Sequence, residues 1–271
     1  MSDAHQRRFV ASNAGFNGGT FDTVGTFMCG RDVEGFQMPA LYRNLGGGKF
    51  ADVSAAMRVD RAALVMGSNF GDLDNDGWLD FVLGTGGPDL GALLPNLAFK
   101  NDLGRGFLDV TATTGLGHLQ KGHGVAFGDL DDDGDQDLFC ELGGFVSSDV
   151  YPNALFENPG NANHWITLRL QGVQANRSAI GARIVAKIGA RTIQRQIMGT
   201  SSYLSVCDFR VLLGIGDAAS IDELTIYWPG REKQVITKLG VGKYYRVVEG
   251  QEPVEFVPGE KRFEPVHRAA S

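Results

Sequence analysis

The sequence has few cysteines and no long apolar run. Its 271 residues contain only Cys29, Cys140 and Cys207, far apart, with no CxxC pair and no histidine at metal-ligand spacing. An odd, scattered set argues against a disulfide framework and against a zinc site. No stretch approaches the roughly 18 apolar residues of a membrane helix, and Arg7 and Arg8 precede too few apolar residues for a signal peptide. We expect no membrane association and a cytoplasmic location for the sequence as it stands, or secretion if the chain is a processed fragment.

Positive charge is also scarce. Lys and Arg number 25 against 32 Asp and Glu, a net charge of −7. Binding to nucleic acid or to an anionic membrane requires clustered cations, so this balance argues against both partners. Ten of the acids fall within residues 72–80 and 129–137, and without them the balance is 25 − 22 = +3. Such local blocks of carboxylates are solvated, disordered or neutralised by a cation.

Proline is rare, with 9 residues, whereas glycine is abundant, with 38. This mixture is typical of short strands joined by tight turns and predicts an all-β fold. The segment FGDLDNDGWLDF at 70–81 matches FGDLDDDGDQDL at 127–138 at an offset of 57 residues. At the same offset, residues 41–44 align with 98–101 and 155–158, and FADVSAA from Phe50 aligns with FLDVTAT from Phe107. Because these separate segments all align at the same offset, the sequence predicts a structural repeat of 57 residues.

Each repeat unit contains short apolar runs bounded by Gly, Asn and Asp. The runs predict strands that end at Phe70 or Phe127, strands from Asp80 or Asp137, and two further strands, which is the composition of a four-stranded propeller blade. We assign residues 1–160 to this repeat region, with residues 1–40 as a degenerate first unit. About 2.8 units are too few for an ordinary closed propeller. We therefore expect the second domain to complete or cover the open array, or oligomerisation through the incomplete propeller.

The composition changes near residue 160. Residues 161–250 read as alternating strands without an acidic loop, which predicts a second β domain resembling a sandwich. The tail, residues 251–271, carries three prolines between charged residues and is predicted to be extended.

The two acidic loops are predicted metal sites. In DLDNDGWLD the carboxylates stand at positions 1, 3, 5 and 9, and Gly77 at position 6 permits the positive φ of a sharp turn. Numerous hard oxygen ligands on a flexible loop favour Ca²⁺ over Zn²⁺ and Mg²⁺. The predicted ligands are Asp72, Asp74, Asp76, Asp80 and the carbonyl of Trp78 in the first loop, and Asp129, Asp131, Asp133, Asp137 and the carbonyl of Asp135 in the second, which turns at Gly134.

The loops differ from an EF-hand. Position 12, where an EF-hand carries a bidentate Glu, holds Leu83 or Cys140, and strands flank both loops. Two calcium ions would change the formal charge from −7 to −3. We expect the second site to bind more tightly, because Asp132 and Asp135 add negative charge to it.

The first half resembles the FG-GAP or VCBS repeat, through its FGDLDxDGxxD loops and the turn of Tyr42-Arg43-Asn44 with Gly48-Lys49-Phe50. The second half resembles the ASPIC/UnbV domain, through segments that include Asn163-His164-Trp165, 176–182, 202–205, 214–216, Trp228-Pro229 and Glu249-Gly250. This pairing occurs in the cartilage acidic protein family and in UnbV-type proteins of natural-product clusters. The resemblance implies calcium-stabilised propeller blades.

Two functions remain open. The sequence lacks GxSxG, HExxH and phosphate-loop motifs, which favours a non-enzymatic calcium-binding module for an unidentified small-molecule, protein or glycan ligand. The alternative, from the UnbV resemblance, is an intracellular natural-product enzyme of cyclase or isomerase type, in a polyketide or enediyne context, with structural calcium and no organic cofactor. Its candidate acid and base groups are His123, Glu141, His164 and Tyr203.

Overall fold

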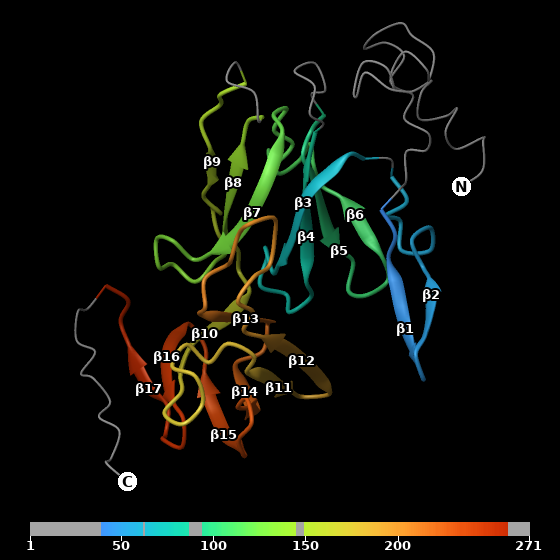
Figure 1. The fold of residues 1–271 in the computed structure, drawn as a ribbon. Helices are drawn as coiled ribbons and strands as arrows, with labels where there is room; N and C mark the ends of the chain where they lie inside the picture. Colours follow the sequence, from blue (N-terminus) through green and yellow to red (C-terminus); the bar gives the residue numbers. More distant parts are fainter. Residues whose placement is uncertain (1–38, 62, 87–93, 145–148, 260–271) are drawn as a thin grey trace, which may run out of the picture. The chain divides into compact units, whose positions relative to one another are not determined.

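The computed structural model describes residues 39–61, 63–86, 94–144 and 149–259, and within these ranges every regular element is a β-strand. The predicted all-β fold is therefore confirmed (Figure 1). No helix in the described ranges is long and apolar enough to cross a membrane. Nearly all of the degenerate unit predicted for residues 1–40 lies outside the described residues.

The described residues form two compact units. The first contains residues 39–69, 80–125 and 139–154. Its strands form an antiparallel hairpin, a four-stranded sheet in the order β3-β4-β5-β6 and a three-stranded sheet in the order β7-β8-β9. In the four-stranded sheet β5 is antiparallel to both β4 and β6. The strands are β1 (Tyr42–Gly46), β2 (Lys49–Asp52), β3 (Val65–Gly71), β4 (Asp80–Thr85), β5 (Leu97–Asn101), β6 (Phe107–Asp109), β7 (Gly122–Gly128), β8 (Asp137–Leu142) and β9 (Ala154–Phe156).

The strands keep the offset of 57 residues found in the sequence. The first residues of β3 and β7 are 65 and 122, those of β4 and β8 are 80 and 137, and those of β5 and β9 are 97 and 154. The β1–β2 hairpin corresponds to β5–β6 in the same register. One four-stranded sheet, β3–β6, is described, whereas the sheet of the last repeat contains three strands, β7–β9, within the described residues.

Aromatic packing joins strands of the four-stranded sheet β3–β6. The ring of Phe81 stacks on Phe99 at 4.7 Å between centroids and meets Phe107 edge-on at 4.8 Å. Leu83 and Leu97 are buried in the same cluster. Because β4, β5 and β6 each contribute to it, this cluster fixes the sheet from which the first acidic loop departs.

The second unit contains a β-sandwich whose strands lie within residues 164–256. Its sheets have the orders β13-β10-β16-β17 and β12-β11-β14-β15. Both sheets contribute isoleucine, leucine and valine side chains to one continuous hydrophobic core, as the alternating pattern predicts. The strands are β10 (His164–Gln171), β11 (Arg183–Ile188), β12 (Arg191–Gln196), β13 (Val211–Gly216), β14 (Ser220–Tyr227), β15 (Lys233–Gly240), β16 (Lys243–Val248) and β17 (Val254–Phe256).

The compact second unit also includes both acidic loops. Residues 70–79 and 126–138 group with residues 155–259 rather than with the strands from which they extend. Within the described residues, the strands of the sandwich and of the repeats belong to separate sheets, so the sandwich adds no strand to a blade. The sandwich therefore contributes to the acidic loops through side chains.

Candidate metal centres

The two acidic loops adopt the turn that their glycines predict. Gly77 has φ of +91° and Gly134 has φ of +93°, both in the left-handed region. Asn75 and Asp132, which are 57 residues apart, also share a positive φ, at 56° and 63°. The repeated sequence thus produces the same backbone path twice, with carboxylates gathered on the inside of each turn.

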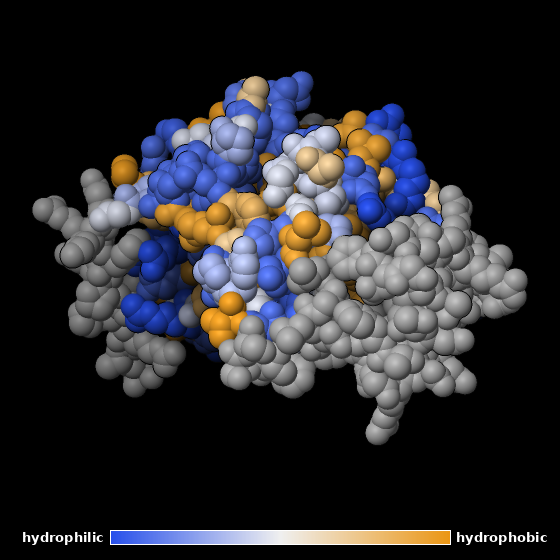
Figure 2. All heavy atoms as spheres, turned by 90° about the horizontal axis from the view of Figure 1, so that it is seen from above, coloured by the Kyte–Doolittle hydropathy of each residue, from blue (hydrophilic) through white to orange (hydrophobic). Residues whose placement is uncertain are grey.

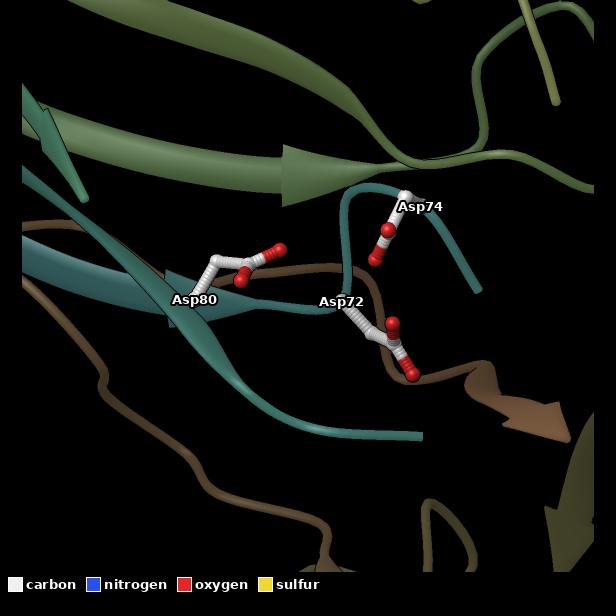
Figure 3. A group of neighbouring side chains, drawn as sticks. All are labelled: Asp72, Asp74 and Asp80. Atoms are coloured by element: carbon white, nitrogen blue, oxygen red, sulfur yellow. The ribbon is translucent and has the colours of Figure 1, made fainter. Parts of the chain in front are cut away.

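The first loop brings the carboxylate oxygens of Asp72, Asp74 and Asp80 within 4.8 Å of one another. Figure 3 shows Asp72 and Asp74 on the loop and Asp80 at the start of β4. Asp76 is not a member of this group, and its Oδ1 accepts a hydrogen bond from the backbone N–H of Trp78 at 2.7 Å. Three of the four predicted carboxylates therefore converge.

The second loop gathers a different subset. Asp129, Asp131 and Asp133 bring their carboxylate oxygens within 4.8 Å of one another. Asp137 instead accepts hydrogen bonds from the backbone N–H groups of Leu130, at 2.8 Å, and Asn158, at 2.9 Å. The group thus consists of positions 1, 3 and 9 in the first loop but positions 1, 3 and 5 in the second.

The aspartate at position 9 links each loop to the asparagine that follows its blade strand. The Oδ1 atom of Asp80 accepts from the backbone N–H of Asn101 at 2.7 Å, which is the counterpart of the Asp137–Asn158 bond. The Oδ1 of Asn101 in turn accepts from the N–H of Gly104 at 2.8 Å. The asparagine that stands in each repeat at the place of Asn44 therefore has a structural role. Its backbone N–H bonds to the aspartate at position 9 of the acidic loop, and its side chain closes the turn that follows.

Arginines of strand β12 contact the first loop. Arg195 Nη2 lies 3.2 Å from Oδ2 of Asp72 and 3.3 Å from the carbonyl oxygen of Gly77. Arg191 Nη1 donates to the carbonyl oxygen of Asp76 at 2.9 Å. Because Asp72 is only 1% exposed, its carboxylate needs this compensating charge.

The second loop has a neutral partner at the equivalent carboxylate. The hydroxyl of Tyr244 donates to Oδ2 of Asp129 at 2.6 Å. Arg210 donates to Asp132 at 2.5 Å and to the backbone carbonyl of Asp129. Burial raises the pKa of Asp129, and burial together with the neighbouring Asp129 carboxylate raises the pKa of Tyr244. The tyrosine therefore keeps its proton and acts as a donor.

Hydrogen bonds join the two loops directly. Asn75 Nδ2, from the first loop, donates to Oδ1 of Asp135 at 2.5 Å and to the carbonyl oxygen of Gly134 at 3.2 Å. Asn161 Nδ2 donates to the same Asp135 oxygen at 2.9 Å. Burial, and next the repulsion of Asp133, raise the pKa of Asp135 to about 6. The Asp135 side chain therefore belongs to the contact between the loops, and only its carbonyl is a predicted ligand.

Several partners of the loops were not predicted. Asn158 and Asn163, on the chain that enters the sandwich, donate to the carbonyl oxygens of Leu73, at 2.8 Å, and Asp74, at 2.7 Å. Asn158 and Asn163 stand in recognisable motifs, but no local pattern marks the others. The full set is Asn158, Asn161, Asn163, Arg191, Arg195, Arg210 and Tyr244.

The donor chemistry of both groups fits Ca²⁺. Each presents three hard carboxylate oxygens at short mutual distance on a turn that also offers backbone carbonyls. Like charges so placed repel one another, and a divalent cation compensates this repulsion. The remaining predicted ligands, Asp76, Asp137 and the carbonyls of Trp78 and Asp135, stay predictions.

The candidate catalytic residues are divided between the units. His123, on β7, places Nε2 2.6 Å from the carbonyl oxygen of Gly143, and Glu141 is exposed on the adjacent strand β8. In the second unit, His164 Nδ1 lies 2.9 Å from the carbonyl oxygen of Ala218, and Tyr203 is 54% exposed. Their role as acid and base groups stays a prediction.

Neither cysteine of the described ranges is a member of a carboxylate group. Cys140 is buried on β8, and burial raises the pKa of its thiol to about 12. The sulfur of Cys207 accepts from the N–H of Phe127 at 3.3 Å. These environments are typical of cysteines that act as small packing residues. Cys29 lies outside the described residues.

These features define an all-β protein in which a strand repeat with acidic loops precedes a sandwich domain. Comparison with protein families gives two matches: the FG-GAP-like repeat over residues 17–83 and the ASPIC and UnbV domain over residues 172–254. These two matches confirm the predicted resemblance, to the FG-GAP repeat in the first part of the chain and to the ASPIC/UnbV domain in the second. No curated protein matches the chain in sequence.

Proposed function

We propose that this chain is a calcium-binding interaction or ligand-binding module in which two ions hold the acidic loops against the sandwich. The convergence of three carboxylates in each loop is the observation that carries the proposal. Asp72, Asp74 and Asp80 would hold one ion, and Asp129, Asp131 and Asp133 the other. Bound calcium supplies positive charge and oxygen coordination, which fits a structural role.

The loops also join separate parts of the second unit. They bond to each other through Asn75 and Asp135 and to the sandwich through Arg195 and Tyr244. An ion that fixes either loop would therefore also fix the adjoining sandwich surface. This arrangement supports a structural effect of calcium rather than an ion that takes part in chemistry.

Hollows on the second unit supply surface for a ligand. One hollow of about 300 Å³ lies beside the second loop and is lined by residues that include Asp132, Arg169, Arg210 and Phe256. A broader, open depression of about 740 Å³ is lined by residues that include Gln174, Arg231 and Glu249. Both combine acidic and basic side chains, which supports recognition of a polar ligand. On the face drawn in Figure 2, hydrophobic side chains are also exposed in several places between hydrophilic ones.

Elemental analysis and thermal melting test the calcium role. We expect the purified protein to hold about two calcium ions, and chelation to lower its melting temperature. Stabilisation is about 2.7 kcal/mol per site at a hundredfold excess over Kd. Asp74→Ala and Asp131→Ala should each remove about one ion and part of the stabilisation, and the double variant should remove most of it. Absence of bound calcium together with unchanged melting on chelation would refute the calcium role.

Screening on glycan and protein arrays tests the module role. The calcium-loaded protein should bind a partner above background, and the chelated protein or the double variant should bind less, because the sandwich surface loses its support. A screen in which no glycan, protein or surface is bound above background counts against the module. In that case the two calcium ions would remain as structural ions only.

A further inference from the structure

We infer that Arg195 acts as a built-in counter-cation of the first acidic loop and makes it the weaker of the two calcium sites. The inference rests on the proposed calcium function and adds a residue that sets affinity. It follows from a comparison of the two loops at position 1, where Asp72 and Asp129 occupy equivalent places in the repeat.

The partners of these two carboxylates differ in charge. Asp72 Oδ2 lies 3.2 Å from Nη2 of Arg195, and the two side chains are 1% and 12% exposed, so solvent screens this ion pair only weakly. Asp129 Oδ2 accepts its bond from the neutral hydroxyl of Tyr244 at 2.6 Å. In the first loop, a proposed calcium ligand therefore faces the permanent positive charge of a guanidinium. In the second loop, the equivalent carboxylate faces the neutral hydroxyl of a tyrosine.

The second loop has an arginine nearby, but its charge is matched elsewhere. Arg210 Nη1 pairs with Asp132 at 2.5 Å, and its Nε pairs with Asp208 at 2.5 Å. Neither carboxylate belongs to the group of Asp129, Asp131 and Asp133. Arg210 also lies close to Asp129, whose backbone carbonyl accepts a bond from it, but two carboxylates outside the group offset its charge. The carboxylates of the second loop therefore face less uncompensated positive charge than Asp72 does.

The position of Arg195 has opposite consequences with and without calcium. In the calcium-free protein its charge offsets the repulsion within the first loop and stabilises the fold. When calcium arrives, the guanidinium repels the ion at short range and weakens binding. The first loop should thus keep its structure after chelation, whereas the second loop should depend on its ion.

Calcium titration of single-site variants tests this inference. Asp131→Ala disables the second loop, so calorimetry reports the first alone. In that background, Arg195→Gln should lower Kd by about tenfold, because it removes the charge but keeps polar donors. Arg195→Lys keeps the charge and should stay within about threefold of the parent. In the Asp74→Ala background, Tyr244→Phe removes only a neutral donor and should change the Kd of the second loop less than Arg195→Gln changes that of the first.

A matched charge control and a second measurement complete the test. Arg183→Gln makes the same change of net charge at a residue whose guanidinium lies over the ring of Tyr227, and it should leave the Kd for calcium unchanged. In metal-free buffer, Arg195→Gln should melt below the parent, and saturating calcium should narrow or reverse the difference. An unchanged or raised Kd in Arg195→Gln would overturn the inference and make Arg195 a residue that orients Asp72. Failure of every variant and of the parent to bind calcium would instead refute the proposed function.

Discussion

Replacing Gly134 by alanine should displace the second acidic loop from the sandwich and destabilise the protein. A Cβ atom at this position would lie 1.8 Å from Cε2 and 2.0 Å from Cζ2 of Trp165, far inside van der Waals contact. The φ of +93° adds a strain of about 1–2 kcal/mol for a residue with a Cβ. Overpacking of a close-packed site costs about 1–3 kcal/mol. We therefore expect a loss of about 2–5 kcal/mol in the free energy of unfolding.

Thermal melting in saturating calcium measures this loss, at about 2–4 °C per kcal/mol for a unit of this size. Gly115→Ala is the matched control, because Gly115 has φ of +75° and no atom lies within 4 Å of its added Cβ. It should show the backbone strain alone. Since the ring of Trp165 packs on Tyr244 at 4.9 Å, Gly134→Ala should also weaken calcium binding at the second loop. Equal melting temperatures for both alanine variants would refute the packing argument.

Three further predictions concern the buried groups. Lys121→Met should lower the free energy of unfolding by about 3–5 kcal/mol, because it leaves the buried carboxylate of Asp149 without its ion-pair partner. Adding Asp149→Leu should recover part of the lost stability in a thermal melt. No recovery would contradict the conclusion that the two residues act as a pair. Changing both Cys140 and Cys207 to alanine should leave bound metal unchanged in elemental analysis, whereas a decrease would assign a thiol to the metal. In calcium-free protein the melting temperature should fall as pH rises from about 4 to about 6. The raised pKa of Asp135, about 6, means that the folded state holds a proton that the unfolded state has released in this window; a rise would contradict that assignment.

The repeat and its loops could be predicted because their determinants are local. A strand, a glycine turn and alternating aspartates lie within a dozen residues, and the second copy at 57 residues repeats the same local rules. Gly77 and Gly134 take the positive φ that a sharp turn requires, and β4 and β8 begin where the sequence indicates. The partners of the loops follow no such rule: Arg195 stands 123 residues from Asp72, and Tyr244 stands 115 residues from Asp129. Only the packing of the sandwich brings these side chains to the loops.

This dependence on tertiary packing changes the reason for expecting unequal sites. From the sequence, the extra carboxylates Asp132 and Asp135 are expected to strengthen calcium binding at the second loop. In the structure the charge of Asp132 is matched by Arg210, and the Asp135 side chain accepts hydrogen bonds from Asn75 and Asn161 and has a raised pKa, so both side chains are already engaged outside the ligand group. The asymmetry rests instead on what faces position 1, a guanidinium in one loop and a phenol in the other. A count of acidic residues in a repeat loop is therefore a poor measure of its calcium affinity when a second domain supplies the counter-charges.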